Sequence, residues 1–272
     1  MHRLRLLTAA ALGPLLFIVL WWGGRMLFDL VLLGATALCL YEYFTICFSG
    51  RRVIQGLGVI LGLFPAFSVL LWGNPEFIVP AVYIAFLGSA LLFLVSYNRW
   101  SNAAWNWTSF FMGIAYVGVC AAHLGLLRHM PMGREWVLFL LVTVFSGDAG
   151  AYYAGKGIGR HKLCPNVSKG KTVEGAAGGL ISNAVAAFFL WFVLLRDIDP
   201  RALILLALVI GAVGQVGDLV ESMVKRSAGV KDSGSILPGH GGILDRVDAV
   251  LLASPCLYWI LSLYRIDGVL IR

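Results

Sequence analysis

Charged residues and cysteines are both scarce in this sequence, and the two shortages exclude several classes of protein. Asp, Glu, Lys and Arg make up 13% of the 272 residues, about half the share that is typical of a soluble domain. Hydrophobic residues make up 60%, and the mean hydropathy is +0.85. A globular core cannot bury so much apolar surface, whereas a lipid bilayer can. The composition therefore excludes a soluble enzyme and a disordered chain.

The five cysteines are scattered along the chain without any C-x-x-C spacing. This pattern excludes a disulfide framework and a structural zinc site. The patterns H-E-x-x-H and G-x-S-x-G, which mark zinc proteases and serine hydrolases, are also absent. Gly170-Lys171-Thr172 is similar to the end of a phosphate-binding P-loop, but that motif requires a glycine where Pro165 stands.

Long apolar segments follow one another along almost the whole chain. A helix needs about 20 apolar residues to cross a bilayer, and nine segments reach or approach that length. We therefore predict an all-α fold, a polytopic integral membrane bundle of about nine transmembrane helices. The predicted segments are 8–24, 26–48, 53–72, 78–96, 108–128, 135–155, 174–195, 201–223 and 243–264.

Basic residues outnumber acidic ones, with 21 Lys and Arg against 14 Asp and Glu and a formal net charge of +7. In a soluble protein this excess would suggest nucleic acid, whereas in a membrane protein cytoplasmic loops carry it beside anionic headgroups. We therefore expect membrane lipid as a partner and no nucleic acid. Most basic residues fall on the side of the N-terminus when the helices alternate. This bias predicts that the N-terminus and the loops 156–173 and 224–242 are cytoplasmic, in the inner membrane if the protein is bacterial.

The two halves of the chain differ in their polar residues. Before residue 140 the acidic residues are few, namely Asp29, Glu42, Glu76 and Glu135. After it, polar residues crowd the helix ends and the two long loops. We interpret residues 1–134 as transmembrane scaffold helices and residues 135–272 as the catalytic region.

The richest polar run covers residues 214–248. Its acidic residues are Asp218, Glu221, Asp232, Asp245 and Asp248. Ionisable groups at membrane helix ends are costly unless they are paired, hydrated or metal-bound, and clustered carboxylates with waters and phosphate oxygens suit Mg²⁺. Lys225, Arg226 and Lys231 add cations for phosphates. Gly241 and Gly242 would let the backbone approach a ligand just before a helix N-terminus, which itself favours anions.

A second polar run covers residues 146–175. Asp148 lies inside an apolar segment, where a charged side chain is a functional candidate. The following loop is rich in basic and hydroxyl side chains and suits a phosphate or nucleotide. Its candidate ligand-binding residues are Ser168, Lys169, Lys171 and Thr172.

Each of these features also has a purely structural interpretation. Asp245 could be a helix-start acid that the helix dipole favours, and Asp218 could form a structural ion pair with Lys225. Asp148 could be a buried polar group bonded to a neighbouring helix. The loop 156–173 could owe its basic residues to topology alone. The concentration of polar residues within 214–248 on one membrane face favours a functional site.

A long pattern of fixed positions runs through the richest polar run. It consists of Ser222, Lys225, Arg226, Lys231, Asp232, Pro238, Gly239, His240, Gly241, Gly242, Asp245, Arg246 and Asp248. This pattern resembles the signature of the phosphatidate cytidylyltransferases, also called CDP-diglyceride synthases. The resemblance extends over residues 140–250. Residues 168–175 depart from the family's usual Ser-Pro-Lys-Lys-Thr-Trp-Glu-Gly at Lys169, Gly170 and Val173.

The resemblance implies an enzyme that joins CTP and phosphatidic acid, giving CDP-diacylglycerol and pyrophosphate. It implies Mg²⁺, with the number of metal ions left open, and suggests a homodimer. Under this hypothesis Asp218, Asp245 and Asp248 bind metal, and Lys225, Arg226 and Lys231 hold phosphates. Ser222, Asp232, His240 and Arg246 orient the site, with Gly241 and Gly242 beside them. Asp148 and the segment Ser168–Thr172 contribute from the other polar run.

Two other functions fit a polytopic membrane protein with buried acids. Another Mg²⁺-dependent membrane phosphotransferase, such as a CDP-alcohol phosphatidyltransferase, would carry a D-G-x-x-A-R pattern, which is absent. A transporter or channel would use Asp148 and Asp218 as an ion path. It would show broken helices at matching positions in two repeated halves, and the sequence contains no such repeat.

Overall fold

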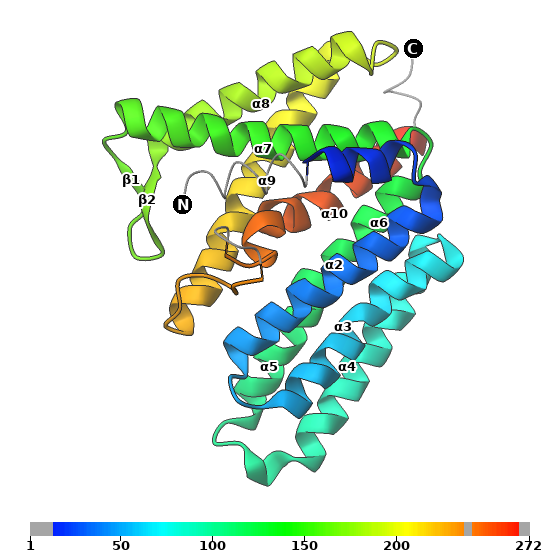
Figure 1. Ribbon diagram of the computed structural model, residues 1–272, viewed down its shortest axis with the longest axis vertical. Coiled ribbons are helices and arrows are strands. Elements are labelled where there is room, and N and C mark those ends of the chain that lie inside the picture. The colour runs from blue at the N-terminus through cyan, green and yellow to red at the C-terminus, as the bar shows by residue number, and fades with distance from the viewer. Residues whose placement is uncertain (1–12, 237–240, 267–272) are drawn as a thin grey trace. The chain divides into compact units, whose positions relative to one another are not determined.

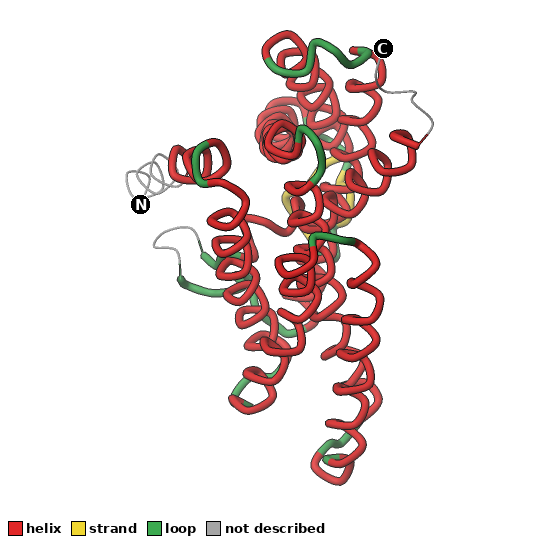
Figure 2. Tube along the Cα trace, turned by 90° about the vertical axis from the view of Figure 1, so that its right-hand side faces the viewer, coloured by secondary structure: helices red, strands yellow, loops and turns green. Residues whose placement is uncertain are grey.

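The computed structural model describes residues 13–236 and 241–266, and Figure 2 shows that helices make up nearly all of them. Residues 13–21 are helical and precede the elements labelled in Figure 1. Those elements are α2 (Gly24–Cys47), α3 (Arg52–Trp72), η1 (Pro75–Phe77), α4 (Ile78–Val95), η2 (Tyr97–Arg99), α5 (Ala103–Gly113), η3 (Ile114–Val119), α6 (Cys120–His129), α7 (Gly133–Ile158), β1 (Lys162–Cys164), β2 (Ser168–Thr172), α8 (Val173–Val193), α9 (Pro200–Ser227) and α10 (Leu244–Ile266).

Eight helical stretches of the described chain are long and apolar enough to cross a membrane. They correspond one by one to the last eight predicted segments, which confirms the all-α membrane bundle. The first predicted segment, 8–24, lies partly outside the described residues. Large apolar side chains cover the helix surfaces; Val53, Val79 and Val95 are 76%, 73% and 90% exposed. Such surfaces suit contact with lipid, and the protein is an integral membrane protein.

Some helix ends differ from the prediction. The fifth span begins at Ala103, because the side chain of Asn102 caps it by accepting a hydrogen bond from the amide of Trp105. Helix α9 continues to Ser227, four residues beyond the predicted end. The predicted loop 156–173 contains an antiparallel hairpin of β1 and β2, in which Lys162 pairs with Thr172. This hairpin was not predicted, because two short polar strands give no clear apolar alternation.

The chain forms two compact units. Unit 1 consists of residues 1–129 and 228–246, and unit 2 of residues 130–227 and 247–272. In unit 1, α2, α3, α4 and the continuous stretch from α5 to α6 lie side by side (Figure 1). The proposed roles of scaffold and catalytic region stay predictions. The structure adds that residues 228–246, half of the richest polar run, belong to the unit of the N-terminal helices.

Aromatic packing holds the C-terminal end of α2 in unit 1. Phe44 and Phe110 are fully buried, with ring centroids 4.9 Å apart. Phe48 and Phe93 join the same cluster, and the hydroxyl of Tyr43 donates a hydrogen bond to the carbonyl of Ser109 at 3.0 Å. Buried rings of this kind fix the neighbouring turns of α2, which include Glu42.

Two glycines allow α3 and η3 to touch within unit 1. A Cβ atom at Gly118 would overlap the backbone carbonyl of Gly62. Close backbone approach at small residues is a common way for membrane helices to pack. η3 is a π-helical turn inside the span from α5 to α6.

In unit 2, α8 packs against both α7 and α9. The side chain of Asn183, which is buried, lies between Gly147 of α7 and Gly211 of α9, where a Cβ atom would overlap it. At one end of α7 and α8 the hairpin projects from the helices (Figure 1). This packing places β2, the start of α8 and the end of α9 in one region.

We predict that Gly118→Ala destabilises the protein, because the added methyl group overlaps the Gly62 carbonyl. The expected loss is about 1–3 kcal/mol, as for other overpacked cores. Thermal unfolding of the purified protein in detergent measures it.

Gly34→Ala in α2 is the matched control, because a Cβ atom there meets nothing within 4 Å. It should leave the unfolding temperature unchanged or raise it slightly, since alanine favours helix more than glycine does. Equal stability of the two variants would contradict the proposed contact.

Candidate active site

The hairpin of unit 2 is fastened to the start of α8. The carboxylate of Glu174 accepts hydrogen bonds from the backbone amides of Arg160 and His161, at 3.0 and 3.2 Å, and pairs with the His161 ring at 2.5 Å. The hydroxyl of Thr172 caps α8 by accepting from the amide of Gly175 at 3.1 Å. These contacts hold both ends of the hairpin, so the position of β2 is set by the first turn of α8.

An ion pair joins the hairpin to α9. The ammonium of Lys171 in β2 lies 2.5 Å from a carboxylate oxygen of Asp218. Both side chains are partly covered, at 24% and 34% exposure. The hydroxyl of Ser222, one turn along α9, donates to the other oxygen of Asp218 at 3.5 Å. The structure thus brings together one predicted residue from each polar run.

A second ion pair lies one turn further along α9. Lys225 pairs with Glu221, four residues earlier, and both residues are buried. The ion pairs of this unit thus join Asp218 to Lys171 and Lys225 to Glu221, where a structural pair of Asp218 with Lys225 was the alternative. Arg226 is exposed and donates to the carbonyl of Val167, at the hairpin turn, over 3.4 Å. The end of α9 and the hairpin thus share a cluster of opposite charges.

Asp248 in unit 2 lies near charged side chains of two other helices. Asp248 of α10 is buried, and its carboxylate accepts from the amide of Ala249 at 2.8 Å. Asp218 of α9, Asp148 of α7 and the ammonium of Lys225 are all near enough to act on it electrostatically. Like charges that repel one another in a partly dry place favour the entry of a cation.

No three Asp, Glu, His or Cys side chains among residues 13–236 and 241–266 lie close enough together to hold a metal ion. The arrangement therefore lacks an all-protein metal cage. Mg²⁺ usually binds through one or two carboxylates together with waters and substrate phosphates. The oxygen donors of Asp218 and Asp248 fit that mode, and the predicted metal set of Asp218, Asp245 and Asp248 stays a prediction.

Unit 1 carries the other half of the richest polar run. One oxygen of Asp245 accepts from the backbone amides of Ser233 and Gly242, at 3.0 and 2.9 Å. A first-turn acid that reaches back to an amide before its own helix is similar to a capping box. These contacts fit the interpretation of Asp245 as an acid at a helix start, and its role as a metal ligand stays a prediction.

A glutamate from the N-terminal helices contacts the same loop. Glu42 of α2 is buried, and its carboxylate accepts from the amides of Ile243 and Leu244, at 3.0 and 2.8 Å. It also accepts from the hydroxyl of Ser233 at 3.1 Å. A Cβ atom at Gly242 would overlap this carboxylate, so the missing side chain lets the backbone approach Glu42. The expected contact of Gly241 and Gly242 with a ligand stays a prediction.

The remaining predicted residues lie on the surface or outside the described chain. Lys231, Asp232 and Arg246 are exposed in unit 1. In unit 2, Lys169 and Asp148 are exposed, and Ser168 pairs with Cys164 across the hairpin. Gly241 has a positive φ of 82°, which suits glycine. His240, together with Pro238 and Gly239, lies outside the described residues.

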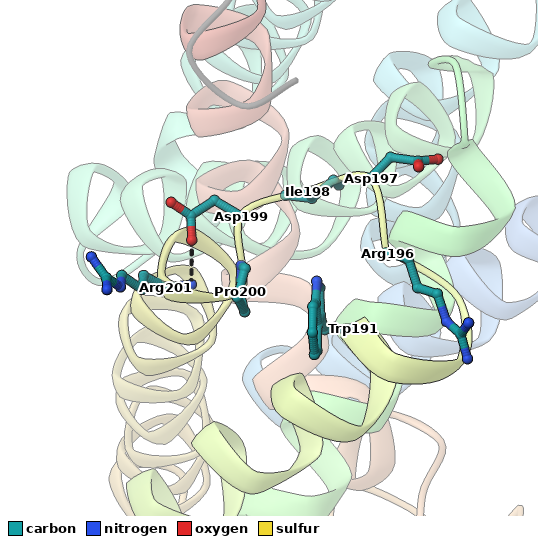
Figure 3. A pocket seen from close by; sticks show the side chains of 7 residues that line it. All are labelled: Trp191, Arg196, Asp197, Ile198, Asp199, Pro200 and Arg201. Carbon is teal, nitrogen blue, oxygen red and sulfur yellow. Dashed lines mark hydrogen bonds between the residues drawn. The ribbon is translucent and has the colours of Figure 1, made fainter. Parts of the chain in front are cut away.

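A cavity of about 740 Å³ in unit 2 contains none of these residues. It is lined by Trp191, Pro200 and the turn between α8 and α9 (Figure 3). In this turn the carboxylate of Asp199 accepts from the amide of Arg201 at 2.8 Å. The cavity lies at the far end of α8 from the hairpin. This cavity thus does not coincide with the chemically richest part of the unit.

Three acidic residues with defined contacts were missing from the predicted site, namely Glu42, Glu174 and Glu221. The rule that singled out Asp148, a lone charge in an apolar segment, also applies to Glu42. Glu221 lies four residues before Lys225, a spacing that favours an ion pair in a helix. Glu174 lies two residues after its capping threonine, in the first turn, where acids are favoured.

Comparison with known proteins gives one consistent result. The sequence pattern of the Cytidylyltransferase family matches residues 3–264. The phosphatidate cytidylyltransferase of Bacillus subtilis (strain 168) is 34% identical over 96% of this chain and 97% of its own. That of Brucella suis biovar 1 (strain 1330) is 35% identical over 93% and 91%. That of Staphylococcus saprophyticus is 38% identical over 75% and 76%.

The match is broader than the resemblance over residues 140–250 predicted, because it includes the N-terminal helices as well. The relatives do not favour a transporter or another class of membrane phosphotransferase. Since the family pattern spans nearly the whole chain and two of the relatives match 96% and 93% of it, this chain belongs to the cytidylyltransferase family.

Proposed function

We propose that this protein transfers the CMP group of CTP to phosphatidate, giving CDP-diacylglycerol and pyrophosphate. Its membership of the cytidylyltransferase family and the names of its relatives support this activity. The structural observation that carries the proposal is the pairing of Lys171 with Asp218. This pair brings side chains of both polar runs together at one end of unit 2. A reaction between phosphates requires cations and carboxylates in one place.

The chemistry needs charge compensation more than it needs a base. An oxygen of the phosphatidate phosphate attacks the α-phosphorus of CTP. The bond from that phosphorus to the oxygen bridging the β-phosphate breaks, and pyrophosphate leaves with the electron pair. The attacking phosphate is already anionic, so no strong base has to activate it. Fixed cations reduce the repulsion between the two anionic substrates and stabilise the charge on the leaving group.

Lys171, Lys225 and Arg226 are the cations of unit 2 best placed for this task. In the structure the first two are neutralised by Asp218 and Glu221. An unpaired ammonium near a membrane would be costly, so such internal pairs keep the site stable before substrates arrive. Substrate phosphates then replace the carboxylates as partners of these lysines, and Arg226 at the hairpin turn adds a planar cation that suits phosphate.

Asp218 and Asp248 would hold Mg²⁺ together with the phosphates of CTP, and Asp245 is predicted to join them. The support is chemical, since clustered carboxylate oxygens suit this ion and Asp248 already lies within reach of the charges of Asp148 and Asp218. When bound, Mg²⁺ supplies Lewis-acid stabilisation of phosphoryl oxygens. Ser222 orients Asp218 through its hydroxyl.

The orientation in the membrane follows from the substrates and the charges. CTP is water-soluble and cytosolic, and the phosphate of phosphatidate lies at headgroup depth. The hairpin and the end of α9, which carry Lys171 and Arg226, therefore face the cytoplasm, as does the N-terminus. In a bacterium the membrane is the inner one. A homodimer stays a prediction, which size-exclusion chromatography with light scattering would check.

The first experiment uses purified full-length protein in detergent, with phosphatidate and radiolabelled CTP. We expect label to enter the lipid phase and pyrophosphate to be released when Mg²⁺ is present, and neither to occur with EDTA. Folded protein that labels no lipid with any of several phosphatidate species would contradict the proposed function. Labelling that is equal with EDTA and with Mg²⁺ would contradict the metal requirement alone.

We predict that Asp218→Asn lowers kcat at least about 100-fold, as for loss of a preorganised charged group. The substitution keeps the side-chain volume but removes the charge that holds Lys171 and, by proposal, the metal. The lipid-labelling assay measures it. Asp197→Asn is the matched control, since Asp197 is an exposed acid of the same unit at the far end of α8. Near-normal activity of folded Asp218→Asn would refute the role of this carboxylate.

We expect Lys171→Gln to lower kcat/KM about tenfold to a hundredfold, the usual cost of one hydrogen bond to a charged group. Steady-state kinetics at varied CTP concentration test this. Lys162→Gln serves as the control, because Lys162 is an exposed lysine in the other strand of the same hairpin. If both variants lose activity equally, the hairpin contributes only general positive charge.

A further inference from the structure

Glu42 is a deeply buried acid of unit 1, and it contacts the loop that precedes α10. It is 2% exposed and lies in an apolar helix, 191 residues before Ser233 in sequence. A carboxylate in such a place is costly unless several donors surround it. Glu42 has three, namely the hydroxyl of Ser233 and the backbone amides of Ile243 and Leu244.

Two of these donors belong to the start of α10. Leu244 is the first residue of the helix and Ile243 precedes it, so their amides are among those that a helix leaves without internal acceptors. A negative charge in this position also complements the helix dipole. The N-terminus of α10 thus receives a carboxylate of this chain, and the same contacts hold the end of the loop against α2.

The loop is shaped around this carboxylate. A Cβ atom at Gly234 would lie 2.7 Å from an oxygen of Glu42, and one at Gly242 would overlap the other oxygen. Ser233 and Gly242 are also the two residues whose amides bond to Asp245. Two carboxylates, one from α2 and one from α10, therefore both bond to Ser233, and between them they accept from the successive amides of Gly242, Ile243 and Leu244.

The contacts of Glu42 hold the backbone next to several candidate site residues. Ser233 directly follows Lys231 and Asp232, and Leu244 begins the helical turn that carries Asp245 and Arg246. The side chains of Lys231, Asp232 and Arg246 are exposed, whereas the Glu42 carboxylate is turned to the loop's own donors.

We propose that Glu42 is a positioning residue for the nucleotidyl transfer. It holds the segment made of residues 231–236 and 241–246 in its working conformation without touching a substrate itself. This inference rests on the proposed function, because the segment's side chains matter only if they act on substrate phosphates. It assigns a specific task to the N-terminal helices beyond that of a scaffold.

The test is Glu42→Gln, assayed for lipid labelling with varied CTP and phosphatidate. Glutamine keeps the size of the side chain. It replaces one of the two acceptor oxygens by an NH₂ group, which cannot accept a hydrogen bond from the donors around Glu42. Small displacements of catalytic groups mainly weaken the transition state. We expect kcat to fall about tenfold to a hundredfold, with KM for both substrates within about threefold of the wild-type value.

Glu76→Gln, at an exposed acid of the same unit, is the control and should keep wild-type kcat. Unchanged kcat in folded Glu42→Gln would overturn the proposal. A rise in KM that accounts for the whole loss would also overturn it, because that result indicates direct substrate binding. Wild-type protein without activity would contradict the proposed function instead, which separates the two failures.

Ser233→Ala supplies a second and milder variant, since it removes one of the three donors to Glu42 and leaves the backbone contacts. If Glu42→Gln does not fold, Ser233→Ala tests the proposal in its place. We expect it to lower kcat by a smaller factor and to leave KM unchanged. When both single variants fold, their combination should lose less than the product of the two effects, because both act through one contact. Strict multiplicativity would overturn a shared positioning role.

Discussion

A carboxylate inside a membrane helix bundle must find cations or several hydrogen-bond donors, because no bulk water is present to solvate it. In this protein that requirement connects segments that are far apart in sequence. Asp218 finds Lys171 of the hairpin, Glu221 finds Lys225 one turn away, and Glu42 finds the start of α10. Asp218 and Glu42 thus each fix the position of a second element of their own unit, whereas the pair of Glu221 and Lys225 lies within α9.

The two units satisfy this requirement in different ways. In unit 2 the carboxylates of Asp218 and Glu221 are matched by the ammonium groups of Lys171 and Lys225, which lie at the ends of long side chains. In unit 1 the carboxylates of Glu42 and Asp245 are matched by backbone amides and the hydroxyl of Ser233, which are held by the chain's own fold. The first arrangement suits binding and release of anions, and the second suits rigidity. A transferase that must both bind charged substrates and keep its groups aligned needs both properties.

Glycine has a corresponding role in the polar parts of the fold. Gly242 and Gly234 leave room for Glu42, and Gly118 lets one helix touch another at Gly62. These positions are explained by close approach of other groups of the same chain. In the sequence, the glycines near residue 241 indicated a turn that binds a ligand. A glycine shows that another group can approach the backbone, but it does not show whether that group is a substrate or a side chain such as Glu42.

The sequence alone determined the membrane bundle, because apolar length and charge are local properties and eight predicted segments recur as spans. It also determined the family, since the fixed positions from Ser222 to Asp248 can be read in order along the chain. Only the tertiary structure decided which charges pair, because the partners of Asp218 and Glu42 lie 47 and up to 202 residues away. It also decided that the loop 156–173 folds as a hairpin. Those outcomes depend on the packing of separate helices, on which local sequence patterns carry no information.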